Sequence, residues 1–264
     1  MNKNQLISII TVSYNAVSTI EKTILSVINQ TYDNIEYIII DGGSTDGTIE
    51  IIKKYEHNIS YWISEPDKGI YDAMNKGIKL AKGDWINFMN AGDTFYNNKI
   101  INEIFSYHCK GDILYGNVYY EQNGYKIIKK ATTPQLSNIN LSFCHQSSFV
   151  KSSIIKKHPF NTIYKLSADY AMFMSLLSEG FKFIYVDICI AKYDRNGISS
   201  NNWKTNYENL LIHQNYNKIC FLRRILFYTK FYILANENIP GIKFIKKISF
   251  KMKIKNNTNF IVLD

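Results

Sequence analysis

The chain has 264 residues, of which 46% are hydrophobic and 20% charged, and this composition excludes a disordered or fibrous protein. The net charge of +9 is uneven, because residues 203–264 carry 11 Lys and Arg against 3 Asp and Glu, whereas residues 1–202 are nearly neutral. The four cysteines show no metal-ligand spacing, which excludes a zinc-finger type of site and is typical of a reducing compartment.

The N-terminus and the hydropathy pattern indicate a cytoplasmic protein. A polar tetrapeptide leads straight into a strand-like stretch, so no signal peptide is expected, and no run of 18 apolar residues predicts a membrane span. We expect an α/β catalytic domain at residues 1–202, divided into halves at 1–93 and 94–202. Residues 203–264 are expected to form a basic helical extension.

The first 93 residues alternate between short apolar runs and helical patterns. The apolar runs predict buried strands at Leu6–Val12, Ile35–Ile40, Tyr61–Ser64 and Trp85–Met89. Helical spacing predicts helices at Ser18–Asn29, from an N-cap cluster at Ser44-Thr45-Asp46 through Lys54, and at Gly69–Leu80. This βαβαβαβ order predicts a mostly parallel, Rossmann-like sheet with helices on both faces.

A polar loop follows each of these strands, and open α/β sheets bind ligands at the carboxyl ends of their strands. The four loops are therefore expected to meet at one crevice, which makes residues 1–93 the nucleotide-binding half. They contain Tyr14-Asn15, Asp41-Gly42-Gly43, Glu65 to Lys68, and Asn90 to Asp93.

Residues 94–202 show a different pattern and are expected to form the half that binds the acceptor. Gln122-Asn123-Gly124 predicts a hairpin turn between two strands. The elements expected here are strands at Ile113–Glu121, Tyr125–Lys130, Phe143–Val150 and Phe181–Val186, and a helix at Ser167–Glu179.

The basic extension combines Lys and Arg with large apolar residues at helix-like spacing. Trp203–Asn217 is expected to be helical, and Ile219–Leu234 and Ile242–Lys255 show the same mixture. An interfacial helix on an anionic membrane leaflet and a solvated cationic face over an apolar stripe both fit this pattern. Nucleic-acid binding is disfavoured, since the body of the chain lacks a basic face or a recognised motif.

Three acidic residues are candidates for chemistry. The Asp41 carboxylate at a strand end can accept hydrogen bonds from a base or a ribose, but the segment also fits a simple strand-to-helix turn. Asp93 can hold a divalent cation that neutralises a diphosphate leaving group, or it can cap the next helix. Asp169 in the first turn of a helix suits a general base, although locally a capping role is favoured. His145 fits a substrate contact or a structural histidine.

Taken together, these segments resemble the family 2 glycosyltransferases of the GT-A fold over roughly residues 5–200. The most similar subgroup makes bacterial O-antigen, capsule and exopolysaccharide. The resemblance rests on Thr11–Asn15, Asp41–Thr48, Glu65–Gly77, Gly83–Asp93, His145-Gln146 and Ala168–Tyr170.

The resemblance implies a role for each site residue. The uridine would be held by Thr11, Tyr14, Asn15 and Asp41, with Gly42 and Ser44 in the same loop. Asp67 and Lys68 would lie near the nucleotide or its diphosphate. Asn90 and Asp93 would form the DXD-type motif, with manganese or magnesium at Asp93. Asp169 would be the catalytic base of an inverting transfer, and His145 and Gln146 would contact substrate.

Three positions depart from the family pattern. Asn90 replaces the first Asp of the metal motif, so one carboxylate ligand is missing. Ala168 replaces the Glu that usually precedes the base, and Met74 replaces an Arg of the third helix. Because that Arg is absent, Lys68 is our candidate for the contact to the diphosphate.

The resulting expectation is a transferase that moves a hexose or N-acetylhexosamine from a UDP-sugar to a polyprenyl-diphosphate-linked saccharide at the inner face of a bacterial inner membrane. A sugar nucleotidyltransferase is the alternative enzyme, but the first strand is followed by Ser13-Tyr14-Asn15-Ala16 rather than by a Gly-rich, basic loop. A non-catalytic sugar-nucleotide binding module is the third possibility, and it would not need Asp93 and Asp169 together.

Overall fold

A computed structural model describes residues 5–106, 110–138, 140–194, 203–216, 248–252, 254–255 and 257–263. The N-terminal half comprises β1 (Ile7–Ser13), α1 (Ile20–Ile28), β2 (Ile35–Asp41), α2 (Thr48–Lys54), β3 (Tyr61–Ser64), α3 (Ile70–Leu80) and β4 (Trp85–Phe88). The second half comprises β5 (Thr94–Phe95), α4 (Ile100–Ser106), β6 (Ile113–Gln122), β7 (Tyr125–Lys129), β8 (Ser148–Lys151), α5 (Ser152–Ile155), α6 (Ala168–Ser178), β9 (Phe183–Lys192), α7 (Trp203–Gln214) and β10 (Phe260–Leu263).

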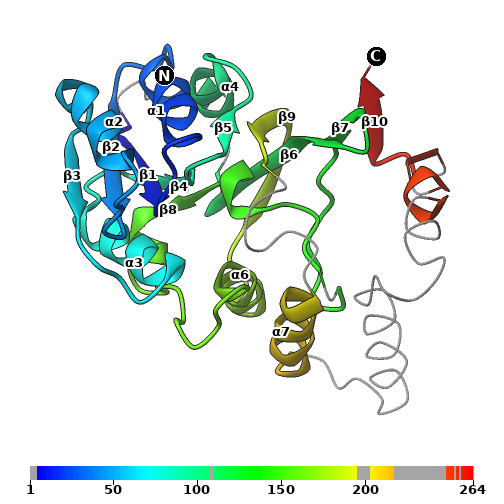
Figure 1. The fold of residues 1–264 in the computed structure, drawn as a ribbon. Coiled ribbons are helices and arrows are strands. Elements are labelled where there is room, and N and C mark those ends of the chain that lie inside the picture. The colour runs from blue at the N-terminus through cyan, green and yellow to red at the C-terminus, as the bar shows by residue number, and fades with distance from the viewer. Residues whose placement is uncertain are drawn as a thin grey trace.

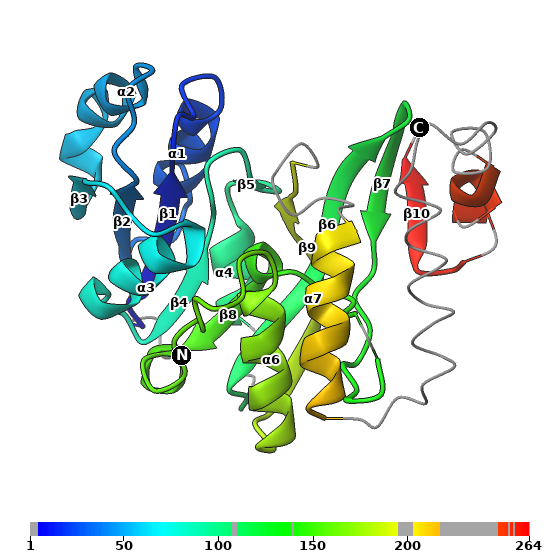
Figure 2. The same ribbon diagram turned by 60° about the horizontal axis from the view of Figure 1, so that its bottom comes forward.

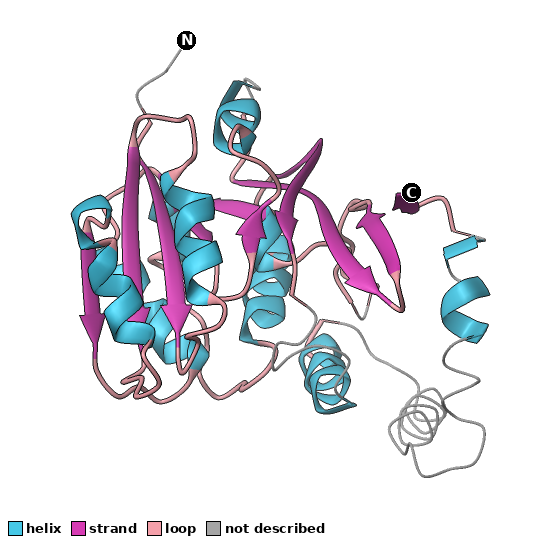
Figure 3. Ribbon diagram, turned by 45° about the horizontal axis from the view of Figure 1, so that its top comes forward, coloured by secondary structure: helices cyan, strands magenta, loops and turns pink. Residues whose placement is uncertain are grey.

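The strands that the structure describes form one sheet, which runs from β3 at one edge to β10 at the other (Figures 1 and 3). The path is β10-β7-β6-β8-β4-β1-β2-β3, and β9 joins it beside β6 and β5. The predicted βαβαβαβ order is confirmed, and β4, β1, β2 and β3 are parallel. The sheet as a whole is mixed rather than mostly parallel, because β8, β7 and β10 pair antiparallel with their neighbours.

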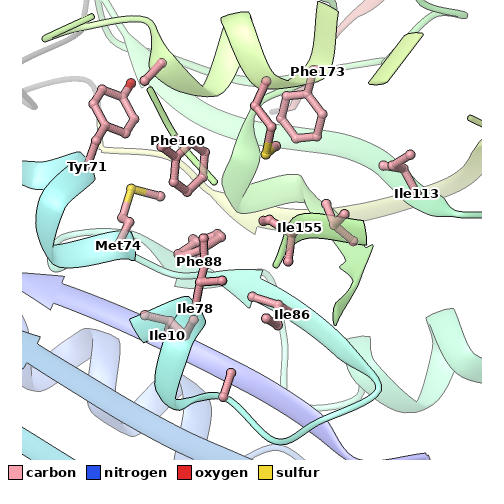
Figure 4. Close-up of a cluster of buried hydrophobic side chains, with 14 of the residues drawn as sticks. Ile10, Tyr71, Met74, Ile78, Ile86, Phe88, Ile113, Ile155, Phe160 and Phe173 are labelled. Carbon is pink, nitrogen blue, oxygen red and sulfur yellow. The ribbon is translucent and has the colours of Figure 1, made fainter. Parts of the chain in front are cut away.

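Helices cover both faces of the sheet, as predicted. Side chains alternate along β1, so Ile7 and Ile9 face α1, α2 and α4, whereas Ile10 and Val12 face α3, α5 and α6. Figure 4 shows the second of these two cores, in which Phe160 packs between α3 and α6. This core fixes α6, which carries Asp169, relative to the parallel strands.

Two local predictions were wrong. Helix α2 begins at Thr48 after Gly47, whose φ of 98° only glycine adopts easily, so the Ser44-Thr45-Asp46 cluster is not its N-cap. Asp46 instead accepts a hydrogen bond from the Thr48 amide. The strand expected at Phe143–Val150 is also shorter, because His145–Ser147 form a 3-10 turn before β8.

The chain beyond residue 202 joins the body of the protein. Helix α7 packs on α6, and Glu208 accepts hydrogen bonds from the Lys165 and Leu166 amides just before α6. Strand β10 pairs antiparallel with β7, which corrects the expectation of an entirely helical extension. Most of residues 218–255, for which we considered an interfacial helix on an anionic leaflet, lie outside the described residues. Within the described residues, every helix is too short or too polar to cross a membrane.

Candidate active site

The loops after β1 and β2 are joined by hydrogen bonds at the carboxyl end of the sheet. The Asn15 amide donates to Ser44 Oγ at 2.8 Å, and the Thr45 amide donates to Asn15 Oδ1 at 3.0 Å. The Gly42 amide donates to the Ser13 carbonyl at 2.8 Å. Asn15 therefore positions the two loops relative to each other, and it does so with a positive φ of 46°, which Asn tolerates better than most residues.

Asp41 is the centre of this loop cluster. Its carboxylate is 0% exposed and accepts hydrogen bonds from the hydroxyls of Ser13, Ser44 and Ser64 and from the amides of Gly43 and Ser44. Burial raises the pKa of Asp41, but these hydrogen bonds outweigh that effect and leave the pKa below its ordinary value. Asp41 thus holds three strand ends together, and its buried side chain gives no support to the direct uridine contact that we predicted.

Thr11 has a similar structural position. It is 0% exposed, and its hydroxyl donates to the Met89 carbonyl at 2.8 Å and lies 3.0 Å from the Tyr37 hydroxyl. The predicted contact between Thr11 and a nucleotide is likewise unsupported by this placement.

Tyr14, Gly42 and Asp67 lie together at this end of the sheet, with Tyr14 exposed, Asp67 partly buried and Gly42 buried. The Tyr14 side chain is 67% exposed. Asp67 Oδ1 accepts a hydrogen bond from the Gly69 amide at 2.7 Å, and Oδ2 lies over Gly42, where an added Cβ would meet it at 2.6 Å. Gly42 therefore makes room for a carboxylate beside an exposed aromatic ring. Lys68 is exposed next to them, as its predicted role requires.

Asp93 lies at the end of the loop after β4 and is 5% exposed. Oδ1 accepts a hydrogen bond from the Asp194 amide at 2.8 Å, and Oδ2 accepts one from Gln146 Nε2 at 2.7 Å. Burial is the main cause that raises the pKa of Asp93 to about 6, against the lowering effect of these two donors. The Asp194 carboxylate adds a second negative charge nearby.

Asp169 lies in the first turn of α6, with Ser167 at the N-cap, and its side chain is 23% exposed. The Tyr71 hydroxyl donates to Oδ1 at 2.9 Å, and His145 Nδ1 lies 3.0 Å from Oδ2. Burial raises the pKa of Asp169, but the hydrogen bonds and charge of His145 and the hydrogen bond of Tyr71 leave it below its ordinary value. The carboxylate is therefore ionised and held in one orientation, which suits a base.

His145 and Gln146 contact the site carboxylates in this structure. His145 Nε2 lies 3.0 Å from Asn90 Nδ2, so this histidine bridges Asn90 to Asp169. Gln146 is buried on Asp93. Both residues thus have positioning roles here, and the predicted substrate contacts stay predictions.

Sequence reasoning missed two residues of the site, Tyr71 and Asp194. Tyr71 belongs to the Glu65–Gly77 stretch that carries part of the resemblance, so that stretch was a usable signal. Asp194 had no local signal, because its position beside Asp93 depends on the pairing of Thr94 with Lys192 between β5 and β9.

The oxygen atoms around Asp93 fit a magnesium or manganese ion that is held mainly by a donor's phosphates. Mg²⁺ at such sites uses one or two carboxylates plus substrate oxygens. The amide oxygens of Asn90 and Gln146 are hard oxygen donors that are buried without a hydrogen-bond partner, and Gln146 contacts Asp93 through its amide nitrogen. No cluster of three or more His, Cys, Asp or Glu that could hold a metal by itself occurs among the described residues.

The sequence of the chain matches a known protein family. The family model described as "Glycosyl transferase family 2" matches residues 8–181. The chain is 27% identical over 239 residues to the putative teichuronic acid biosynthesis glycosyltransferase TuaG of Bacillus subtilis. That alignment covers 84% of this chain and 92% of TuaG.

Solved structures show the same fold at lower identity. TarS 1-349 of S. aureus in complex with UDP-GlcNAc has a TM-score of 0.62 at 16% identity, covering 96% of this chain and 76% of that one. Glucosyl-3-phosphoglycerate synthase from Mycobacterium tuberculosis, in complex with Mn²⁺, UDP and phosphoglyceric acid, has a TM-score of 0.61 at 12% identity. It covers 83% of this chain and 81% of that one.

Proposed function

The chain belongs to glycosyl transferase family 2 and is a glycosyltransferase, and on that premise we propose that it moves a hexose or N-acetylhexosamine from a UDP-sugar to a lipid-linked saccharide. The observation that carries this proposal is the position of Asp169. An ionised, partly exposed carboxylate is held by Tyr71 and His145, and His145 connects it to Asn90 in the loop after β4. A base and a donor crevice joined in this way suit direct displacement at an anomeric carbon.

Asp169 accepts the proton of the acceptor hydroxyl as that oxygen attacks the anomeric carbon of the donor. The new glycosidic bond forms while the bond between the sugar and UDP breaks, so the anomeric configuration is inverted. Tyr71 and His145 keep the carboxylate aimed at the acceptor oxygen. The exposed ring of Tyr14 and the carboxylate of Asp67 are suited to stacking on and hydrogen bonding to the uracil.

The diphosphate leaves with negative charge, which this site must accommodate. When bound, manganese or magnesium would neutralise that charge, and Asp93 with the Asn90 amide oxygen would hold it. Lys68 is exposed beside Asp67 and can place its ammonium against the same diphosphate.

The relatives and the charge of the chain support a role in surface polysaccharide assembly. TuaG is named for teichuronic acid biosynthesis, and by analogy we propose that this chain works at the inner, anionic leaflet of the membrane. The net charge of +8 on residues 203–264 fits attachment to that anionic leaflet. We propose a polyprenyl-diphosphate-linked acceptor and a peripheral location on the inner membrane.

Asp169→Asn keeps the size of the side chain but removes the base. We expect kcat to fall by at least about 10²-fold, because general base catalysis contributes on this scale, while the Kd for UDP stays unchanged. The assay is UDP release from a panel of UDP-sugars with purified acceptor. Full turnover by this variant would rule out the assignment of Asp169 as the base.

The same assay separates the alternatives. A sugar nucleotidyltransferase would release pyrophosphate from a nucleoside triphosphate and a sugar phosphate. A non-catalytic binding module would bind UDP-sugars but release no UDP, with or without acceptor.

A further inference from the structure

A cavity of about 350 Å³ lies beside Asp169, on the side of α6 that faces α7 and the strands β6, β7 and β10. This volume lies within the range of about 300–1,000 Å³ that is usual for small-molecule sites. The wall is rich in aromatic side chains, which are Tyr120, Phe143, Tyr170, Phe173, Tyr193 and Phe260. Asp169 itself forms part of the wall, so a ligand in this cavity lies next to the residue that we assign as the base.

Four residues of the wall, which are Tyr193, Thr205, Asn209 and Phe260, lie outside residues 8–181, the segment that the family model matches. Phe260 comes from the last strand, which pairs with β7 so that Phe260 is opposite Lys129. Asn209 comes from α7, which lies next to α6 (Figure 2). The base is therefore provided by the segment that the family model matches, whereas these four wall residues come from the chain beyond it.

The polar groups of the wall suit hydroxyl-rich ligands. Asn209 is 9% exposed, and its Nδ2 donates to Asn140 Oδ1 at 2.8 Å. Its amide oxygen is buried without a hydrogen-bond partner. This unpaired acceptor costs the fold free energy, and a ligand hydroxyl would satisfy it once the Asn209 amide turns toward the cavity.

We propose that this cavity binds the terminal sugar of the saccharide acceptor, and that Phe260 and Asn209 select that sugar. The proposal rests on the proposed function, and it adds the residues that read the acceptor. A sugar ring has an apolar face of C–H bonds that packs on the negative face of an aromatic ring, and a rim of hydroxyls that need partners. The cavity provides both, together with the carboxylate that takes the proton of the attacking hydroxyl.

The test measures binding of methyl β-glycosides of glucose, galactose and N-acetylglucosamine to the full chain by ligand-observed NMR. At least one glycoside is expected to bind. Phe260→Leu, which removes the ring but keeps an apolar side chain, and Asn209→Ala should each weaken that binding by about fivefold or more. Phe260→Tyr should bind as the wild type does, because it restores the aromatic face.

Ile261→Ala is the matched control, since Ile261 lies on the same strand, is 40% exposed and is not part of the cavity wall. It should bind glycosides as the wild type does, and all variants should keep the same melting temperature within a few degrees. The proposal is overturned if no glycoside binds, or if Phe260→Leu and Asn209→Ala both bind like the control.

UDP release from UDP-sugars by the same proteins separates the two ideas. A wild-type chain that hydrolyses a UDP-sugar but shows no Phe260-dependent glycoside binding keeps the proposed function and loses the cavity assignment. Glycoside binding that depends on Phe260, without UDP release from any UDP-sugar, keeps the cavity as a sugar-binding site but removes the proposed transfer reaction and with it the acceptor role.

Discussion

Two donors act on the basicity of Asp169, and they come from different parts of the chain. Tyr71 is on α3 and His145 is in the 3-10 turn before β8. Burial is the main cause that raises the pKa of Tyr71 well above its ordinary value, and the negative charge of Asp169 is the second cause. The Tyr71 hydroxyl therefore stays protonated and remains a donor. Tyr71 and His145 thus clamp the carboxylate at a position where Ala168 provides no acidic neighbour.

Tyr71→Phe tests this clamp. The Tyr71 hydrogen bond lowers the pKa of Asp169, so its loss raises that pKa, and activity should decline at a higher pH as the solution is acidified. We expect kcat to fall roughly tenfold, the effect of losing about 1.4 kcal/mol of orientation and charge stabilisation. The pH profile of kcat/KM provides the measurement, with UDP binding as a control. A pH profile that does not shift would show that Tyr71 has only a packing role.

Asp93 gives a prediction for stability in metal-free protein. The pKa of Asp93 in the folded protein, about 6, lies above its value in the unfolded chain. Ionisation of Asp93 therefore destabilises the folded protein, and this destabilisation grows as pH rises through about 4 to 6. Asp93→Asn should therefore stabilise the metal-free protein at pH 7.5 by the order of 1–3 kcal/mol. The new amide can donate to Gln146 Oε1 only if the Gln146 amide turns over, because Gln146 presents Nε2 to this position.

Thermal melts at several pH values test this idea. The advantage of Asp93→Asn should shrink toward about pH 4, where both proteins are neutral at this position. Manganese should raise the melting temperature of the wild type in the presence of UDP and leave the variant unchanged. A destabilised variant at neutral pH, or turnover that persists in excess chelator, would contradict the role of Asp93.

The elements place these residues through the loops at the strand ends. The Asp41 carboxylate accepts hydrogen bonds from three serines, Ser13, Ser44 and Ser64, which lie at the ends of β1, β2 and β3. The loops after these strands therefore form one rigid unit. Rigid loops of this kind present Tyr14 and Asp67 to a ligand at low entropic cost.

Gly42→Ala tests the geometry of that unit. The added Cβ would meet Asp67 Oδ2 at 2.6 Å, and Asp67 is held by the Gly69 amide, so the carboxylate must leave its position. We expect weaker UDP binding, by about tenfold, with a small change in melting temperature. Isothermal titration with UDP gives the answer, and unchanged affinity would show that Asp67 does not contact the nucleotide.

At the scale of the whole molecule, the chain end returns to the sheet, and this changes how membrane attachment must be tested. Truncation near Asn217 would remove β10 and Phe260 as well as the basic segment. Charge substitutions in the full chain avoid that problem. We expect Arg223→Gln, Arg224→Gln and Lys230→Gln together to weaken binding to phosphatidylglycerol vesicles by the order of 100-fold, since each basic residue contributes about 1 kcal/mol at such a surface.

Sedimentation with vesicles gives the partition coefficient. The control removes three exposed charges from the N-terminal half, with Lys53→Gln, Lys79→Gln and Lys82→Gln, and should leave binding unchanged. Equal loss in both triple variants would indicate only a general effect of net charge. Binding that survives the Arg223, Arg224 and Lys230 changes would remove the membrane-binding hypothesis for this segment.

The sequence by itself determined the strands and helices of the N-terminal half and the residues from which a site could be built. The Leu6–Val12 and Ile35–Ile40 runs are buried on both faces, and the periodicity of Gly69–Leu80 is that of a helix with one buried side, so local patterns were sufficient. Asp93 and Asp169 were recognisable as candidates because their positions follow a strand and start a helix.

Only the tertiary structure decided which of these residues meet, because contacts across long stretches of chain depend on packing and not on local pattern. Tyr71 and Asp169 are 98 residues apart in sequence, and Asp93 accepts the amide of Asp194 across 101 residues. The same holds for Phe260, which reaches the cavity through a four-residue strand that pairs with β7. The structural roles of Thr11 and Asp41 were likewise visible only in the folded protein. Both side chains are buried, and the partners that satisfy their hydrogen bonds come from other segments of the chain.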